Sequence, residues 1–119
     1  MSTSTAADAN QGLSRFHSLD LLSTLIAVLR ADGAVQFANA ALENTLGLSR
    51  RTLEGADFSA FFTDPALLQT ALTGAKVQDF AALRFTAKLR RPTLDPVPVD
   101  VIVAASERMA AMLVELWPL

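Results

Sequence analysis

Cysteine is absent from this sequence of 119 residues, and histidine occurs only once, as His17. Without cysteine the chain cannot form a disulfide, a thiolate metal site, a thiol nucleophile or a covalent thioether link to a flavin. A single histidine cannot build a zinc site unless carboxylates complete it. These absences remove thiol chemistry and weaken any case for a metal centre.

Clustered positive charge and long apolar runs are missing as well. The net charge is −2, whereas a nucleic-acid-binding surface needs clustered Lys and Arg side chains that replace phosphate counterions. The longest apolar run, from Met109 to Trp117, includes Glu115 and is shorter than the roughly 20 residues that span a bilayer. The N-terminus lacks the basic start and apolar core of a signal peptide. We therefore expect a cytoplasmic protein that binds neither nucleic acid nor membrane.

The chain contains enough apolar residues for one folded domain, since 51% of its residues are hydrophobic. Residues 1–12 are small and polar, and are predicted to form a disordered tail. Residues 13–24 place apolar side chains at broadly helical spacing, which predicts an N-terminal amphipathic helix. Its apolar stripe has two possible partners, the sheet of its own domain or the same helix in a second copy. Residues 25–117 are predicted to form the folded domain.

The stretch from Leu25 to Leu42 carries the clearest local signals. Two short apolar runs, at 25–29 and 34–38, flank the tight-turn pair Asp32-Gly33 and predict a β-hairpin. Asn39 then stands where a helix N-cap belongs, because its side-chain oxygen can accept a hydrogen bond from a first-turn N–H group. The residues after it are good helix formers.

In all, three short helical segments are predicted in the middle of the chain. The helix that begins at Asn39 ends at Gly47, and Ser49 caps a second helical turn that ends at Gly55. A brief aromatic segment follows at 58–62. Asp64-Pro65 then opens a helix as N-cap and first helical residue, and Gly74 is predicted to close it. Helices this short must pack against a sheet.

The remaining residues supply the strands of that sheet. Apolar and polar residues alternate cleanly from Leu83 to Leu89, valines recur at every second position from 97 to 103, and 109–117 reads as a last strand. Pro98 cannot donate a ladder hydrogen bond, so it is expected near the start of its strand or at an edge. The sequence therefore predicts an α+β fold, a five-stranded antiparallel sheet with its helices on one face.

These pieces resemble a PAS domain from about residue 21 to residue 116. The resemblance rests on Ala31-Asp-Gly33, Phe37-Ala-Asn-Ala-Ala41, Leu46-Gly47 and Ser49-Arg-Arg-Thr-Leu-Glu-Gly55. More narrowly, the chain looks like the N-terminal sensor domain of the nitrogen-regulation histidine kinase of the NtrB type. Members of that family have similar elements and end the domain with a stretch comparable to Val114-Glu-Leu-Trp-Pro118.

The resemblance implies a non-catalytic sensory domain of a two-component kinase. The phospho-accepting histidine helix and the ATP-binding glycine boxes of such a kinase are not in these residues, and His17 lacks the context of a phospho-acceptor. The family implies a homodimer, with a response regulator and a PII-type signal protein as partners through the kinase region. The expected interface residues are Leu13, Phe16, Leu19, Leu22, Val114 and Trp117.

No cofactor is expected. Flavin photochemistry in this family needs a cysteine, and haem binding typically uses a histidine from the helix that here spans 64–73, which has none. Relatives that sense carboxylates meet the anion with cationic or hydroxyl side chains. Arg84 and Lys88 share the polar face of their strand with Thr86, so we expect them to point to solvent.

The alternative function is a small-molecule receptor with an apolar pocket. The candidate lining residues are Ile26, Val28, Phe37, Leu42, Leu46, Phe58, Phe61, Phe62, Leu72, Phe85 and Val101. These side chains would equally make a filled core, which close packing favours. A third hypothesis is a small enzyme centred on Asp100, which lies among valines. No second acid, base or oxyanion donor accompanies it, so a surface ion pair is the favoured interpretation of Asp100.

Overall fold

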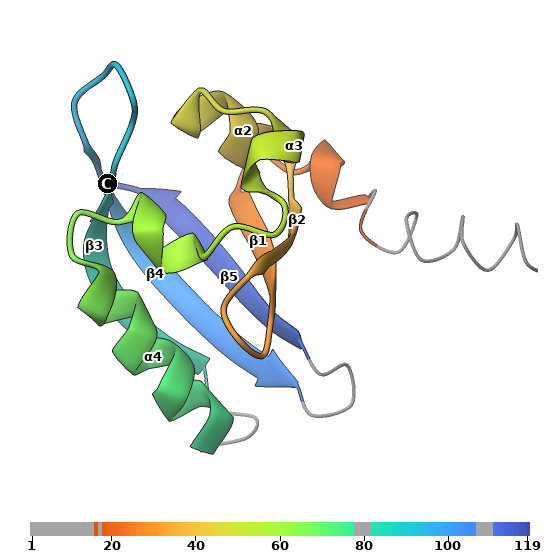
Figure 1. Ribbon diagram of the computed structural model, residues 1–119, viewed down its shortest axis with the longest axis vertical. Helices are drawn as coiled ribbons and strands as arrows, with labels where there is room; N and C mark the ends of the chain where they lie inside the picture. The colour runs from red at the N-terminus through yellow and green to blue at the C-terminus, as the bar shows by residue number, and fades with distance from the viewer. Residues whose placement is uncertain (1–15, 17, 78–81, 107–110) are drawn as a thin grey trace, which may run out of the picture.

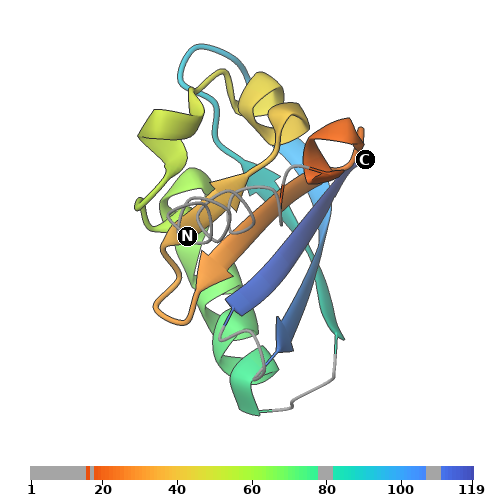
Figure 2. The ribbon, with the colours of Figure 1, turned by 90° about the vertical axis from the view of Figure 1, so that its right-hand side faces the viewer.

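The computed structural model describes residues 16, 18–77, 82–106 and 111–119 (Figure 1). The elements in chain order are η1 (Ser18–Leu21), β1 (Leu25–Arg30), β2 (Val35–Ala38), α2 (Ala40–Leu46), α3 (Arg50–Leu53), η2 (Phe58–Phe61), α4 (Pro65–Val77), β3 (Ala82–Leu89), β4 (Val97–Ser106) and β5 (Ala111–Pro118). The predicted α+β architecture is confirmed. Figure 2 shows α2, α3 and α4 lying to one side of the sheet.

The strands form one antiparallel sheet in the order β2-β1-β5-β4-β3. The first and last strands of the chain are neighbours, with Leu25 opposite Leu116 and Arg30 opposite Ala111. The N-terminal hairpin is thereby joined to the C-terminal three-stranded meander. The connection from β2 to β3 carries all the helices that cover one face, which we call the inner face.

The predicted turns and caps of the first half are confirmed. Gly33 has φ +91° in the β1–β2 turn, where the Ala34 N–H donates to the Asp32 side chain over 3.0 Å. The Asn39 side chain accepts from the Leu42 N–H and starts α2. Gly47 ends that helix in the left-handed conformation, φ +71°, which costs glycine little.

Helix α4 begins as predicted but runs further. Pro65 is its first residue, and the Asp64 carboxylate accepts from the Ala66 N–H at 3.2 Å. The prediction that Gly74 closes the helix is wrong, because α4 continues to Val77. A Cβ atom at position 74 would lie 2.8 Å from Leu83 Cδ1. Glycine is therefore present to let α4 approach β3 closely, not to stop the helix.

The amphipathic helix predicted at 13–24 has a different form in the described part of the chain. Residues 13–15 and 17 lie outside the described residues. Ser18–Leu21 forms a 3₁₀ turn, and the chain has left helical conformation before β1 starts at Leu25. The Leu19 carbonyl accepts from the Leu22 N–H at 3.2 Å, which closes the turn, and also from the Asn39 side-chain amide at 2.9 Å.

The core lies between the inner face of the sheet and the helices. Alternate strand residues such as Val99, Val101 and Leu116 face the helices with no exposed surface. Phe58 in η2 packs edge to face against Phe62, the residue after η2, with the ring centroids 5.3 Å apart. Large side chains without exposure fill this side of the molecule, as expected where a protein interior is closely packed.

Candidate functional site

The sequence-predicted pocket residues divide between the two faces of the sheet. Those on the inner face belong to the main core or pack against it; they are Leu42, Leu46, Phe58, Phe61, Phe62, Leu72, Phe85 and Val101. Leu42, Phe58, Phe62 and Val101 have no exposed surface at all. On this side the candidate residues therefore serve as core, the alternative that close packing favoured.

Ile26, Val28 and Phe37 lie on the opposite, outer face. They alternate in β1 and β2 with core residues, and Val28 stands opposite Phe37 in the ladder. A β-bulge between Val28 and Leu29 shifts the register of β2. All three side chains are nonetheless buried, at 4%, 4% and 6% exposure. Something other than the helices of the inner face must cover them.

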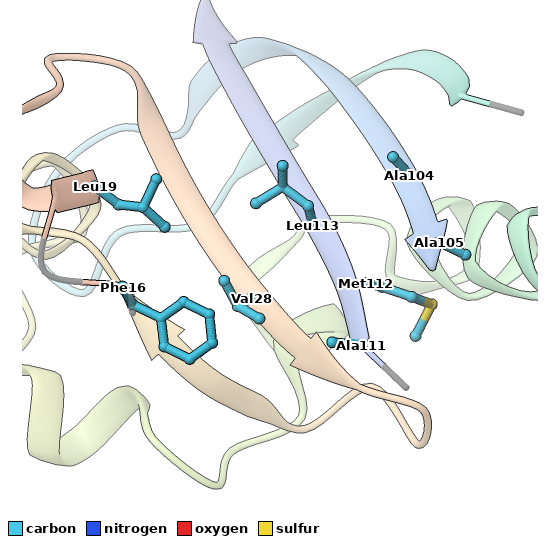
Figure 3. A pocket seen from close by; sticks show the side chains of 8 residues that line it. All are labelled: Phe16, Leu19, Val28, Ala104, Ala105, Ala111, Met112 and Leu113. Atoms are coloured by element: carbon cyan, nitrogen blue, oxygen red, sulfur yellow. The ribbon is translucent and has the colours of Figure 1, made fainter. Parts of the chain in front are cut away.

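Phe16 and η1 supply cover on this face, and these described residues before β1 are called the N-terminal segment below. The Phe16 ring stacks on the Phe37 ring with centroids 5.4 Å apart and planes at 29°. Between this segment and the sheet lies an apolar groove of about 360 Å³, drawn in Figure 3, lined by Phe16, Leu19, Val28, Ala104, Ala105, Ala111, Met112 and Leu113. The groove is the candidate functional site.

Asn39 holds the N-terminal segment over this face. Its side chain, with no exposed surface, donates to the carbonyls of Leu19 at 2.9 Å and Thr24 at 2.8 Å. Its oxygen accepts from the backbone N–H groups of Ile26 at 3.0 Å and Leu42 at 3.1 Å. One amide therefore joins the turn η1, strand β1 and helix α2. The N-cap role was predictable from sequence, but the link to Leu19 was not, because nothing local indicates a partner 20 residues away.

The predicted interface residues fall into three groups. Phe16 and Leu19 line the groove, Leu22 and Trp117 are 47% and 46% exposed, and Leu13 lies outside the described residues. The prediction of Val114 as an interface residue is wrong. Its side chain is fully buried in the inner core, because residues at even positions of β5 face the helices while Trp117 faces outward. Val114 therefore cannot contact a second copy.

Asp100 lies on the outer face and pairs with Arg84, with the Nη2 and Oδ2 atoms 2.7 Å apart. The Arg84 side chain is 66% exposed, and Thr86 and Lys88 are exposed beside it. This is the surface pairing that the sequence favoured for Asp100. In the part of the chain that the structure describes, no three His, Asp or Glu side chains converge as a metal site would require. No helix of the described ranges is long and apolar enough to cross a bilayer.

Comparison with known proteins gives a consistent result for the fold. The chain is similar to the PAS domain of an HTR-like protein from Haloarcula marismortui, with TM-score 0.78 and 20% identity over 98% of this chain and 99% of that one. It is also similar to a PAS domain of a two-component sensor histidine kinase, with TM-score 0.74 and 11% identity over 94% and 99% of the two chains. No family model and no curated protein sequence matches it.

A third similar structure bears on the narrower resemblance. It is the PAS domain of nitrogen regulation protein NR(II) from Vibrio parahaemolyticus, with TM-score 0.62 and 21% identity over 85% of this chain and 94% of that one. Identities this low establish the fold alone. The chain has the PAS fold, as its motifs predicted.

Proposed function

We propose that this chain is a sensory PAS domain of a two-component histidine kinase, and that it works without catalysis by transmitting a conformational state through a homodimer. Support for the kinase context comes from the fold and from the similar structure of a sensor histidine kinase. The expected site of action is the cytoplasm.

The finer proposal is a nitrogen-regulation kinase of the NtrB type. It is supported by the Phe37-Ala-Asn-Ala-Ala41 and Ser49–Gly55 elements and by the likeness to the NR(II) domain from Vibrio parahaemolyticus. In that case a response regulator and a PII-type protein are partners of the kinase region. The conformational state of this domain then shifts the balance between the states of the kinase region.

One observation carries the proposal for dimerisation. The apolar side chains between sheet and helices are sealed, whereas the outer face keeps an open apolar groove with exposed Trp117 on the same face. A self-complementary face of this kind suits a two-fold interface, in which each patch meets its copy. Small shifts across such an interface bias the segments that leave it. The small-molecule receptor is not favoured, because Leu42, Phe58 and Phe62 fill the inner core.

The test is sedimentation velocity at micromolar concentration with a matched pair of variants. Leu113 lines the groove from β5, so Leu113→Glu places a charge inside the proposed interface. Leu67→Glu makes the same change on α4, at a side chain that is 40% exposed on the inner-face side. We expect a dimer for the parent and for Leu67→Glu, and a monomer for Leu113→Glu. A parent protein that stays monomeric, or identical behaviour of both variants, contradicts the proposal.

A further inference from the structure

The turn η1 is tied to helices α2 and α3 by a cluster of charged groups. The Asp20 carboxylate accepts from the Ala40 N–H at 2.8 Å and from the Arg50 guanidinium at 2.8 Å. The same guanidinium lies 3.3 Å from Glu43 Oε2, and the Arg50 N–H donates to Glu43 Oε1 at 2.6 Å. Arg50 in α3 therefore holds η1 and α2 together.

A stack of rings extends this cluster to the groove. The Arg50 guanidinium carbon lies 4.7 Å from the centroid of the Phe37 ring, a distance at which a cation is attracted to the ring face. Phe37 in turn stacks on Phe16, which forms a wall of the groove. Arg50 thus contacts Asp20 in η1 directly and is connected to Phe16 through the ring of Phe37.

The ion pairs of the cluster are partly buried, but one donor in it lacks a hydrogen-bond partner among the described residues. The side chains of Asp20, Glu43 and Arg50 are 28%, 24% and 30% exposed, so their attraction is screened less than that of a surface pair. The Arg50 Nε atom is buried and has no hydrogen-bond partner in the described part of the molecule. An unpartnered buried donor costs free energy, so it offsets part of the stabilisation that the ion pairs of the cluster provide.

We propose that Asp20, Arg50, Glu43 and Phe37 form a latch that couples helices α2 and α3 to the N-terminal segment. With the latch closed, Phe16 covers Val28 and Phe37, and the groove has its present shape. With the latch open, the segment lifts and the outer face of β1 and β2 is uncovered. The coupling goes beyond dimerisation, because it makes exposure of the outer face depend on the positions of α2 and α3.

The absence of native cysteine provides a direct test. Val28, 4% exposed beside Phe16, is changed to cysteine so that its reaction with a small disulfide reagent requires the N-terminal segment to lift. The rate is compared in the Val28→Cys protein alone and after adding Asp20→Asn, Arg50→Gln or Arg51→Gln. Arg51 is exposed and serves as the matched loss of one positive charge. We expect Asp20→Asn and Arg50→Gln to raise the rate by about five- to tenfold, and Arg51→Gln to leave it unchanged.

A second reporter separates latch opening from loss of global stability. Val114→Cys makes the same exchange on the inner face of the sheet, where the side chain is fully buried. If the latch opens without global unfolding, the reaction rate of the cysteine rises at position 28 and stays the same at position 114. Equal increases in rate at both positions, or no increase at position 28, overturn the proposal. If Val28→Cys does not fold, Ile26→Cys reports from the same outer face, where the side chain is 4% exposed, with the same expected outcomes.

Protein concentration distinguishes this proposal from dimerisation. Shielding of position 28 by a second copy falls as the protein is diluted, whereas the latch acts within one chain and its effect on the rate is independent of concentration. If Asp20→Asn raises the reaction rate at position 28 by the same factor at every protein concentration, the result supports the latch even if the protein is a monomer. If it raises that rate only at high concentration, the result contradicts the latch.

Discussion

Asn39 connects three segments through one side chain. It makes two donor and two acceptor hydrogen bonds while fully buried. An ordinary N-cap makes only the bond to its helix. Such a residue determines not only where α2 begins but also where the N-terminal segment can lie, since both Leu19 and Thr24 depend on it.

At this scale we predict that Asn39→Ala lowers the free energy of unfolding by about 2–4 kcal/mol, because two buried backbone N–H groups and two part-buried carbonyls lose the hydrogen bonds that Asn39 makes. Ser49→Ala is the control, since Ser49 is exposed and caps only α3; its expected cost is about 1 kcal/mol. Urea unfolding followed by circular dichroism measures both. Equal costs for the two variants would show that Asn39 acts as a cap and nothing more.

The elements were predictable wherever a local signal sets them. Asp32-Gly33, Asn39, Gly47 and Pro65 each fix a turn or a helix end through their own backbone and side-chain chemistry, and all four stand where predicted. Strand alternation likewise assigned the inner side chains of β3 and β4. The prediction of both Val114 and Trp117 as interface residues was wrong for Val114, because an even and an odd position of β5 point to opposite faces of the sheet, a signal present in the alternation of the strand itself.

What the sequence did not reveal depends on distant contacts. The pairing of β1 with β5 and the stacking of Phe16 on Phe37 over the outer face join residues far apart in the chain, and the approach of α4 to β3 depends on how two consecutive elements pack. Arg50 is the clearest case. It reads as a polar residue in a short helix, and only the fold brings it to Asp20, 30 residues away.

The packing of α4 on β3 makes a prediction at the scale of elements. Alanine has a higher helix propensity than glycine by about 1 kcal/mol, but a Cβ at position 74 meets Leu83 Cδ1. We expect Gly74→Ala to stabilise the protein in a Leu83→Ala background and to stabilise it less, or destabilise it, when Leu83 is present. Thermal unfolding of the four proteins in this double-mutant cycle gives the coupling. Additive effects would mean that the contact between α4 and β3 does not restrict position 74.

At the scale of the whole molecule, the sheet separates two unlike apolar layers. The inner layer is sealed by helices that follow one another in the chain between β2 and β3. The outer layer depends on a short segment before β1, held by Asn39 and Arg50. Most of the buried apolar side chains belong to the inner layer, so we expect stability to reside chiefly there, and the proposed latch makes the outer layer the part whose cover changes.

Truncation tests this division. We predict that removing residues 1–12, which carry little apolar surface, leaves the free energy of unfolding unchanged. Removing residues 1–21 deletes Phe16, Leu19 and Asp20 and uncovers the side chains of Ile26, Val28 and Phe37. Because full burial of one such side chain is worth about 1.5–3 kcal/mol and burial would be lost only in part, we expect a loss of about 3–6 kcal/mol.

The control for the longer truncation keeps the chain intact. Phe16→Ala with Leu19→Ala removes the two apolar groups that cover the outer face, so it should reproduce most of the loss, whereas Leu21→Ala, at a side chain that is 87% exposed, should reproduce none of it. Urea unfolding gives the free energies, and binding of an apolar dye gives the exposure of the outer face. A 1–21 truncation as stable as the full chain would mean that the sheet and its inner helices form a complete domain, with the N-terminal segment adding nothing to its stability.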